Sequence, residues 1–236
     1  MSSVKLIADL HTHPLGDRYC HSPVRQINRE DRRDIRDYLR HLVARGVQLA
    51  ACTDHDMVSG SVYAREIAVE DGLPIIIVPG AELTVLGKTQ RLHLLALNIQ
   101  KDLPASKMTL REAAREIQAQ GGMAVLAHPV RYPHEINLNP EMLEYLDGLE
   151  IHNRSEGIYQ AGHLLDRESC YRRRFILQTA GSDEHWERDR LNTPVIQAAC
   201  SFELEVAWLV EKNMISREAA ESLLVKEGLL KAVPRK

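Results

Sequence analysis

Short apolar runs alternate with amphipathic helical patterns along most of this chain, and no other feature restricts its possible folds so strongly. Runs of about four to eight residues rich in Val, Ile and Leu are typical of strands buried on both faces of a sheet. Strands that alternate with helices form parallel sheets through right-handed crossovers. We expect strands at Val4–His11, Val47–Thr53, Pro74–Gly80, Leu92–Ile99, Met123–His128, Gly148–His152 and Phe175–Ala180. Seven such strands in one series favour a barrel over two separate domains.

Helices are expected between these strands. The segment Asp31–Arg45 carries an apolar face and ends before Gly46, a residue type that commonly follows a helix C-terminus. Thr109 and Glu112 form a capping box that begins a helix ending at Gly121. Further helices are expected at Ser61–Asp71, Pro140–Leu146, Gly157–Arg173, Phe202–Lys212 and Ser216–Lys226.

One pair of strands interrupts the alternation. Pro74–Gly80 and Leu92–Ile99 are joined through a turn at Gly87-Lys88 without a helix, so we expect a hairpin or a local distortion there. We expect one barrel domain over residues 1–198, and a helical extension over residues 199–236 that packs on the same domain.

Composition and charge exclude several classes of protein. The 30 basic and 33 acidic residues give a net charge of -3, which argues against a bulk electrostatic nucleic-acid binder. The low aromatic content disfavours a nucleic-acid polymer as the partner, because it leaves no platform for base stacking. No apolar run approaches the roughly 18 residues of a membrane span. The segment Met1–Leu10 lacks a signal-peptide pattern, and the four scattered cysteines indicate reduced thiols, so we expect a cytoplasmic protein.

Histidines are the unusual component, because the chain has 11 of them against two Phe and two Trp. Seven of the 11 lie at or near the ends of expected strands, where parallel α/β folds gather their functional groups. In strand order, the metal-capable side chains are His11 and His13; Asp54 and His55; Glu82; His93; His128; His152; and Asp183 and His185. The other histidines, His21, His41, His134 and His163, are expected in loops or on helices as surface or hydrogen-bonded residues.

The spacing of these residues predicts a metal centre. Residues i and i+2 of a strand face the same side, so His11 and His13 can present two ligands to one cavity, and so can Asp183 and His185. Imidazoles combined with carboxylates suit zinc, manganese or iron. The candidates exceed the about four to six ligands of one ion, which favours two or three ions about 3.5–4 Å apart with a bridging carboxylate. Glu82 is the best candidate for that bridge. His152 could be a ligand, a hydrogen-bonding wall of the pocket or a structural residue.

These residues resemble the motifs of the PHP (polymerase and histidinol phosphatase) domain family. The matching segments are Asp9-Leu-His11-Thr-His13, Thr53-Asp-His-Asp56, Gly80-Ala-Glu82, His93-Leu-Leu-Ala-Leu97, Ala127-His-Pro129, Leu149-Glu-Ile-His-Asn153 and Gly181-Ser-Asp-Glu-His185. They follow one another in the family order over about residues 4–190. The resemblance implies an α/β fold, a distorted (β/α)7 barrel of the PHP type with C-terminal helices. It also implies a di- or trinuclear metal site at the C-terminal rim and phosphoester hydrolysis as the usual reaction.

The resemblance also implies a distribution of the ligands. His11, His13, Glu82 and Asp183 would hold a first metal ion, and Glu82 would bridge to a second held by His93 and His128. His55 and His185 would hold a third, with one ligand from the loop after His13. The family commonly has an aspartate five residues past the second histidine, where this chain has Arg18. Either Asp17 or His21 takes its place, or the third ion is weak or absent.

The first functional hypothesis is a metal-dependent phosphoesterase for a small phosphorylated substrate, a phosphomonoester or a nucleotide. Its nucleophile would be a metal-activated hydroxide. Arg131, three residues past His128, is the first candidate for a phosphate clamp, although it could equally be a surface residue. Arg18 and Arg154 are weaker candidates. The general acid would be His185 or a metal-bound water, and Asp9, Asp54 and Asp56 would orient histidines, with a turn or cap role equally open for Asp56.

Two alternatives remain open. Amidohydrolase-type barrels, which cleave C–N bonds, also begin with two histidines after the first strand and end with an aspartate. They often bridge their metals with a carboxylated lysine, whereas Glu82 stands at the bridging position here and Lys88 lies in a turn. The other alternative is a non-catalytic metal-binding PHP-like module.

Overall fold

The structure is a computed structural model that describes residues 5–20, 26–138, 140–154, 159–160, 177–186, 202–211, 214–216 and 218–220. Ten strands of this described part form one curled sheet. Their bounds are β1 Lys5–His13, β2 Leu49–Cys52, β3 Ile76–Leu86, β4 Arg91–Leu97, β5 Met123–Leu126, β6 Gly148–Asn153, β7 Tyr159–Gln160, β8 Leu177–Gly181, β9 Glu184–His185 and β10 Phe202–Glu205. The helices are α1 Arg29–Ala44, α2 Ser59–Glu70, α3 Leu110–Ala119, α4 Pro133–Leu138 and α7 Val206–Glu211, with 3-10 turns at η1 Ala105–Lys107, η2 Pro129–Arg131 and η3 Pro140–Tyr145.

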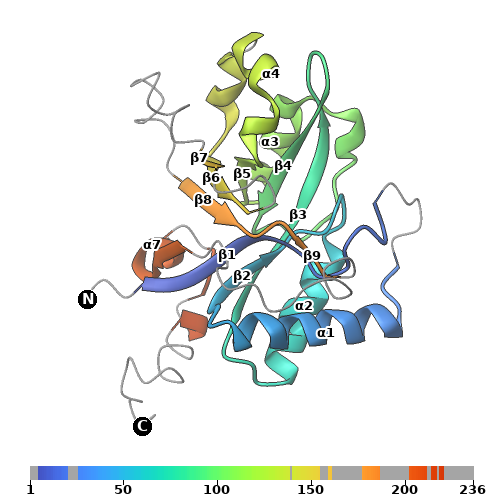
Figure 1. Cartoon of the computed structure of the whole chain (residues 1–236), viewed down its shortest axis with the longest axis vertical. Helices are drawn as coiled ribbons and strands as arrows, with labels where there is room; N and C mark the ends of the chain where they lie inside the picture. The colour runs from blue at the N-terminus through green and yellow to red at the C-terminus, as the bar shows by residue number, and fades with distance from the viewer. Residues whose placement is uncertain are drawn as a thin grey trace.

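The sheet curls like a distorted barrel (Figure 1). Strands β1, β2 and β3 are parallel, and β5, β6 and β8 are parallel. Strand β8 pairs with β6, and β9, which follows directly, pairs with β1. The segment β8–β9 therefore joins the two halves of the sheet. The carboxyl ends of β1 and β9 lie side by side, which positions the site described below.

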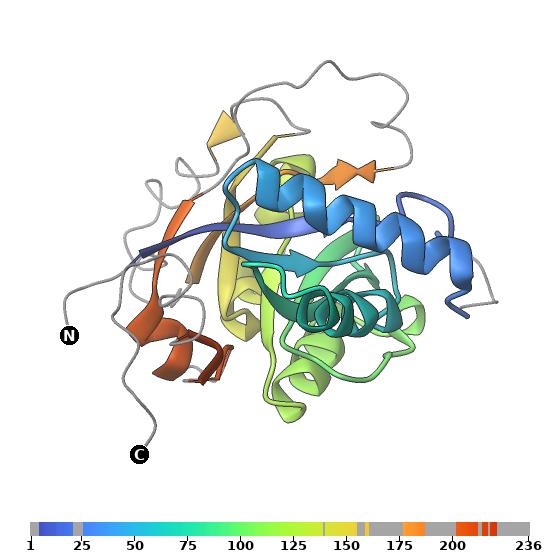
Figure 2. The same ribbon diagram turned by 90° about the horizontal axis from the view of Figure 1, so that it is seen from below.

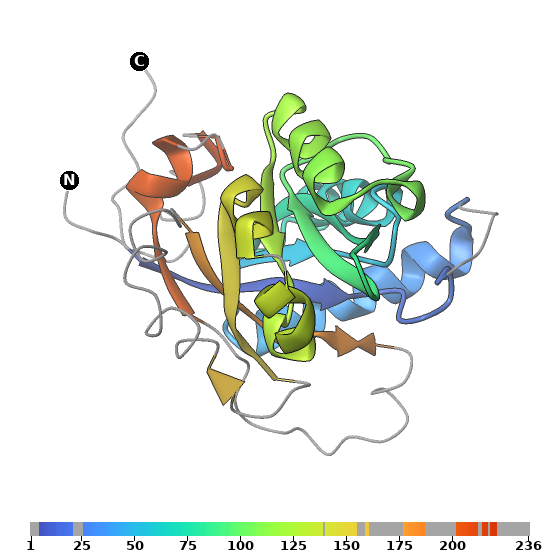
Figure 3. The ribbon, with the colours of Figure 1, turned by 90° about the horizontal axis from the view of Figure 1, so that it is seen from above.

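The interior and the two outer layers contain separate apolar clusters. Successive residues of a strand face opposite sides: in β2, Leu49 and Ala51 face the interior cluster, and Ala50 and Cys52 face the layer of α1 and α2. Figure 2 shows α1 and α2 across that outer face. Helix α3 and η3 cover the opposite half formed by β3, β4 and β5 (Figure 3). Leu209 of α7 is fully buried in the interior cluster.

Several predicted elements differ from the observed ones. The interrupted pair is a hairpin, since β3 and β4 are antiparallel over Gly80–Leu86 and Arg91–Leu97. The helix predicted over Phe202–Lys212 begins only at Val206, because residues 202–205 form β10, antiparallel to β1. Pairing there satisfies the backbone groups of an edge of β1 that would otherwise remain open. The predicted short helix at 140–146 is the 3-10 turn η3, and the short helix α4 lies just before it.

Some expectations fall largely outside the described residues. The helix predicted over Gly157–Arg173 does so, apart from the short strand β7 at Tyr159–Gln160. Only residues 216 and 218–220 of the helix predicted over Ser216–Lys226 are described, and 218–220 are helical. The expected domain boundary at residues 198 and 199 also lies outside. Within the described residues, no helix has the length and apolar character that crossing a membrane requires.

Candidate metal centre

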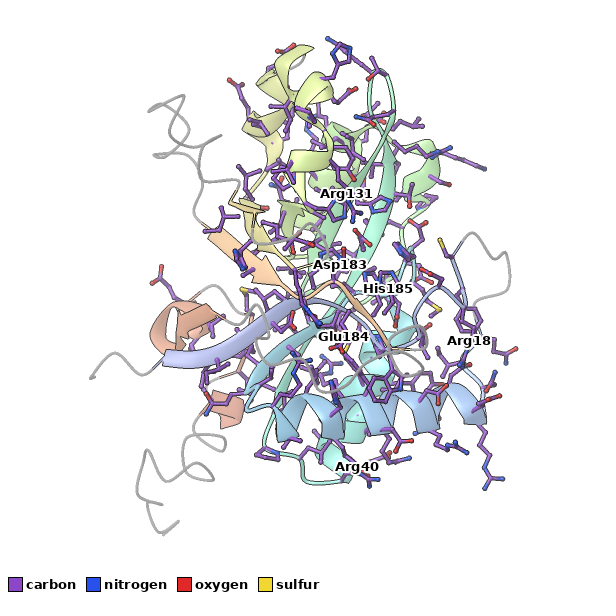
Figure 4. All side chains as sticks on the ribbon, in the orientation of Figure 1. Arg18, Arg40, Arg131, Asp183, Glu184 and His185 are labelled. Atoms are coloured by element: carbon purple, nitrogen blue, oxygen red, sulfur yellow. The ribbon has the colours of Figure 1, made fainter. Side chains whose placement is uncertain are left out.

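The side chains that the sequence predicted to share one rim come together near the middle of the molecule. Figure 4 shows Asp183 and His185 there, with Arg131 above them and Glu184 below. In the described part of the chain, three groups of potential metal ligands have their ligand atoms within 4.8 Å of one another. These groups are His11, His13, Glu82 and Asp183; His55, Glu82 and His93; and His13, His55 and His185.

Strand β1 supplies two fully buried histidines, His11 and His13. Thr12 between them turns away and donates its hydroxyl to the carbonyl of Ala51. The Nε2 atoms of the two histidines lie 3.1 Å apart. Two nitrogens on one tetrahedral zinc ion, each at about 2.0–2.1 Å, would be about 3.3 Å apart, so this pair has the spacing of ligands on a common ion. Burial lowers the pKa of His13 to about 3, which keeps its ring neutral and able to bind a cation.

The Glu82 carboxylate lies at the centre of the cluster. Among the described residues, five imidazoles have a ring nitrogen within 3.4 Å of one of its oxygens, the shortest distance being 2.8 Å to Nδ1 of His93. The five are His11, His13, His55, His93 and His128. Although burial alone would raise the pKa of Glu82, the surrounding histidines hold it well below its usual value. The group is therefore an anion with the position expected of a bridging ligand.

Asp183 lies at the turn between β8 and β9, with a left-handed φ of 53°. Its Oδ1 is 3.2 Å from Nε2 of His13 and 3.4 Å from Nε2 of His11. Its amide donates to the carbonyl of His11 at 2.8 Å, which fixes the turn against β1. His128 also has a positive φ, of 30°. Such strain in non-glycine residues is concentrated at functional sites, because the surrounding structure has to maintain it.

We call His55, His185 and Asp17 the outer group. The Nε2 atoms of His55 and His185 are 3.4 Å apart, and Oδ1 of Asp17 lies 3.2 Å from the latter and 3.8 Å from the former. Nδ1 of His185 donates to the carbonyl of Asp183, so its Nε2 faces the group. Of the two substitutes that the sequence offered for the missing family aspartate, Asp17 reaches this position, and His21 lies outside the described residues.

Several buried polar atoms of the cluster have no hydrogen-bond partner among the described residues. They include Oε2 of Glu82 and Nδ1 of His55, which lie 3.1 Å apart. Buried polar atoms are almost always hydrogen-bonded, so unpaired ones require a partner that the protein itself does not supply. A divalent cation between these nitrogen and oxygen atoms satisfies them, and the mixed donor set suits zinc, manganese or iron. The residues present therefore fit a metal centre.

One residue that the sequence analysis missed is Glu150 of β6, whose side chain is fully buried. Its Oε1 accepts the Nδ1 proton of His11 at 3.0 Å, and its Oε2 accepts from the backbone amide of His128 at 2.7 Å and from Nδ2 of Asn153 at 3.0 Å. A carboxylate that accepts from one ring nitrogen leaves the other free for a cation. A glutamate within the otherwise apolar run that begins at Gly148 was the available signal.

His152, for which three roles were open, belongs to none of the ligand groups in the part of the chain that the structure describes. The pairing of β6 with β8 shifts register between Glu150 and His152. This irregularity breaks the two-residue alternation, so that Asn153 is buried beside Glu150 while His152 is half-buried. Asn153 therefore occupies the place that regular alternation would give to His152.

The three aspartates that were expected to orient histidines each accept a hydrogen bond from a backbone amide. Asp9 accepts at 3.0 Å, Asp54 at 2.9 Å and Asp56 at 2.8 Å. The donors are the amides of Ser182, Leu15 and Thr84, respectively. Burial raises the pKa of Asp9 to about 6 and that of Asp54 to about 8. These contacts hold the segments that carry the candidate ligands.

Arg131 is the candidate cation nearest the cluster. Its Nη1 lies 3.3 Å from Nε2 of His128 and its Nη2 lies 3.6 Å from Oδ2 of Asp183, while 37% of its side chain is exposed. It therefore borders both the buried ligands and solvent. The guanidinium of Arg18 binds Asp31 and Asp34 of α1. For Arg154, the described contact is its amide donating to the carbonyl of Gly181.

The remaining histidines were expected to be surface or hydrogen-bonded residues rather than metal ligands. His41 lies on α1 with its Nε2 3.5 Å from Glu184, and His134 is exposed on α4. His163 lies outside the described residues.

Comparison with known proteins adds independent findings. No protein-family model matches the chain. Over 119 residues it is 28% identical to the uncharacterised protein MJ1587 of Methanocaldococcus jannaschii, a match that covers 50% of this chain and 65% of the relative. Over 116 residues it is 28% identical to the 5'-3' exoribonuclease Rnm of Salmonella typhimurium, covering 49% of this chain and 36% of that enzyme. The match thus spans less than two thirds of either relative.

Solved structures match over nearly the whole chain. A two-domain protein from Bacteroides vulgatus that contains a predicted PHP-like metal-dependent phosphoesterase has a TM-score of 0.59 at 15% identity, covering 94% of this chain and 63% of that one. The chain resembles PHP-like phosphoesterases in its motifs and in its fold. A proposed metal-dependent phosphoesterase from Bifidobacterium adolescentis has a TM-score of 0.56 at 15% identity, covering 95% of this chain and 98% of that one.

An amidohydrolase from Chromobacterium violaceum, with bound sulfate and no metal, has the same TM-score of 0.56 at 18% identity, covering 91% of this chain and 96% of that one. Proteins assigned to two reaction classes therefore share this fold. A fold does not determine a reaction, so the choice between the classes depends on the site.

Proposed function

We propose that this chain is a metal-dependent phosphoesterase that acts at the cluster around Glu82. The observation that carries the proposal is the Glu82 carboxylate, buried among imidazoles, with its Oε2 and Nδ1 of His55 only 3.1 Å apart and neither atom in a hydrogen bond. Without a bound cation this arrangement destabilises the folded protein, because each buried polar atom without a hydrogen-bond partner costs about 1–3 kcal/mol.

The ligands would divide into three sets, the first two of which share Glu82. His11, His13, Glu82 and Asp183 would hold a first ion. Glu82, His93 and His128 would hold a second, since the ring nitrogens of the two histidines lie 2.8 and 2.9 Å from Oε1 of Glu82. The outer group would hold a third. Divalent ions of zinc, manganese or iron would make water acidic enough to attack at neutral pH and would neutralise charge on a phosphoryl group.

The chain's own residues orient these ligands and the substrate. Glu150 holds the proton of His11 on Nδ1, which leaves Nε2 facing the cluster. Arg131, at the border with solvent, binds a non-bridging phosphoryl oxygen, for which a guanidinium is suited by charge and by its paired donors. His185 donates through Nδ1 to a carbonyl and turns Nε2 to His55 and Asp17, an orientation that suits a ligand better than a general acid.

The substrate class is a phosphate ester, and two kinds are considered. A small phosphomonoester or nucleotide suits the net charge of -3 and the low aromatic content. The match to a 5'-3' exoribonuclease over 49% of this chain favours, as a second candidate, the phosphodiester of an RNA strand. The net charge and aromatic content predicted that the partner is not a nucleic-acid polymer. That stays a prediction, and an assay with an oligoribonucleotide tests it.

The test combines metal analysis with a substrate panel. Elemental analysis of purified protein should find bound divalent metal. Phosphate esters assayed with added manganese, zinc, iron or magnesium should be hydrolysed, and a labelled oligoribonucleotide in the same panel distinguishes a polymer from a small substrate. Nucleosides, lactams and ureides test the amidohydrolase alternative.

Two variants make the result specific. His13→Ala should lose metal and activity together, whereas His134→Ala, which removes an exposed histidine on α4, should keep both. Protein that binds metal in full but cleaves no phosphate ester would refute the phosphoesterase, and equal loss in both variants would refute the site.

A further inference from the structure

The outer group depends on two chain segments that are far apart in sequence. Asp17 lies in the loop after β1, and His185 belongs to β9. Their side chains meet at 3.2 Å. Each segment carries, beside its candidate ligand, one charged residue that contacts helix α1: Arg18 in the first and Glu184 in the second.

The first contact lies at the N-terminal end of α1. The Arg18 guanidinium donates through Nη1 to Asp31 and through Nη2 to Oδ2 of Asp34 at 2.6 Å. The next residue, Tyr19, donates its hydroxyl to Asp31 at 2.5 Å. Asp31 is fully buried and also accepts from the amide of the N-cap Asn28 at 2.8 Å. Residues three apart share a helix face, so Asp31 and Asp34 present two carboxylates to one guanidinium.

The second contact lies at the other end of the helix. The buried Glu184 carboxylate accepts from Nη1 of Arg45 at 3.1 Å and from the hydroxyl of Tyr38 at 3.4 Å. Nε2 of His41 lies 3.5 Å from the same carboxylate. Neighbouring residues of a strand face opposite sides, so Glu184 faces α1 while His185 faces the cluster. Figure 4 shows Glu184 directed toward α1 and Arg18 near the N-terminal end of that helix.

We propose that Arg18 and Glu184 are positioning residues, which use α1 as a common frame to bring Asp17 and His185 together as ligands of a separate divalent ion. The proposal rests on the metal-dependent function proposed above. Arg18 stands where the resemblance leads one to expect an aspartate ligand. An arginine there would repel a cation if it pointed inward. Turned to α1, it directs the preceding carboxylate into the site instead.

The pairing also explains why two acidic residues of α1 can remain buried. Asp31 is fully buried and Asp34 is 5% exposed, and a buried carboxylate without a partner is unfavourable. Arg18 satisfies both, and the loop is thereby fixed at one conformation. Ligands held in place before the cation arrives bind it more tightly, because no ordering has to occur on binding.

The test is to titrate metal-free protein with manganese and to measure each binding step by calorimetry and by electron paramagnetic resonance. Asp17→Asn removes the ligand itself and identifies which binding step belongs to the outer group. Arg18→Gln and Glu184→Gln should weaken that same step by about 10- to 100-fold, the usual effect of losing a residue that supports a ligand. The other steps should keep their wild-type affinities. Arg18→Lys should restore part of the affinity, because it keeps the charge.

Arg36→Gln is the matched control. Arg36 also pairs from α1 with a carboxylate, at 2.9 Å from Asp71 after α2, but neither partner adjoins a candidate ligand. Arg36→Gln should lose less stability than Arg18→Gln, because Asp71 is 18% exposed, and it should leave every binding step unchanged. If Arg18→Gln fails to fold, Asp34→Asn replaces one of the two carboxylates that bind the Arg18 guanidinium and hardly changes the shape of the side chain.

The outcomes separate the two proposals. Wild-type protein that binds no manganese would overturn the proposed function. Wild-type protein that binds ions identically to Asp17→Asn would overturn the positioning role and leave the proposed function standing. If Arg18→Gln and Glu184→Gln bind manganese with the same affinities as Arg36→Gln, the positioning role is likewise overturned and the proposed function stands.

Discussion

Replacing Glu150 by glutamine tests how the cluster orients its histidines. The change keeps the shape of a fully buried side chain but replaces one acceptor oxygen by an NH2 donor. The remaining oxygen will face the amide of His128 and Nδ2 of Asn153, because two donors lie on that side and one, Nδ1 of His11, lies on the other. The NH2 group then faces Nδ1 of His11, where two donors would oppose each other.

Neutral His11, the form that binds a cation, can avoid this conflict by carrying its proton on Nε2, the atom that faces His13 and the cluster. A protonated Nε2 does not bind a cation. In the variant, the binding form of His11 therefore lacks the hydrogen bond that Glu150 accepts in the wild-type protein. A hydrogen bond to a charged group contributes about 1.5–3 kcal/mol. At about 1.4 kcal/mol per tenfold, the affinity for the first ion should fall by about 10- to 150-fold.

Competition with a chelator of known affinity, monitored for the first ion bound, measures this change. Glu135→Gln is the control, because Glu135 is equally buried but accepts from the amides of Lys88 and Thr89, away from the cluster. Both variants should melt at a lower temperature, and only Glu150→Gln should lose metal affinity. Equal affinities in the two variants, at full occupancy, would refute the orienting role of Glu150.

Three further predictions follow from the same geometry. Arg131→Ala should lower kcat/KM for phosphate esters by about 10- to 150-fold, the value of a charge-assisted contact, with Arg131→Lys between it and wild type; unchanged kinetics would exclude the arginine from the reaction. Gly181→Ala should destabilise the protein by about 1–3 kcal/mol, because a Cβ there would lie 2.2 Å from Cβ of His11, and an unaltered melting temperature would contradict the close approach of β8 to β1. Although burial opposes it, the carboxylates around His11 raise its pKa well above the usual value, so metal binding at neutral pH must release a proton and affinity must rise with pH until that pKa is passed. Calorimetry in two buffers of different ionisation enthalpy counts the proton, and identical heats would contradict its release.

The strand ends were predictable from sequence because they depend on local rules. Parallel strands bring their carboxyl ends to one rim, and residues two apart in a strand face one side. These rules alone place His11 and His13 together, and they place Asp183 beside them once β9 pairs with β1.

What the sequence could not supply depends on contacts between distant segments. Glu150 acts on a histidine 139 positions away, so its role is visible only when β6 lies beside β1. Asn153 rather than His152 faces the buried side of β6, because the pairing of β6 with β8 shifts register. Such a shift cannot be predicted from the local sequence pattern. Residues 202–205 form a strand because they can pair with β1, and the sequence of this segment alone does not indicate that partner.

The same distinction bears on the choice between phosphoester and C–N bond cleavage. Proteins assigned to both classes share this fold, so the fold and its strand-end positions do not separate them. Charge does separate them. The non-bridging oxygens of a phosphoryl group carry negative charge that a cationic side chain can neutralise, whereas a neutral amide carries none. In the proposed phosphoesterase, Arg131, which lies 3.6 Å from Asp183 at the border of the cluster, would bind the charged part of a phosphate ester, a role that a neutral amide does not call for. Our proposed bridging ligand, Glu82, is a carboxylate rather than a carboxylated lysine, which favours the same class.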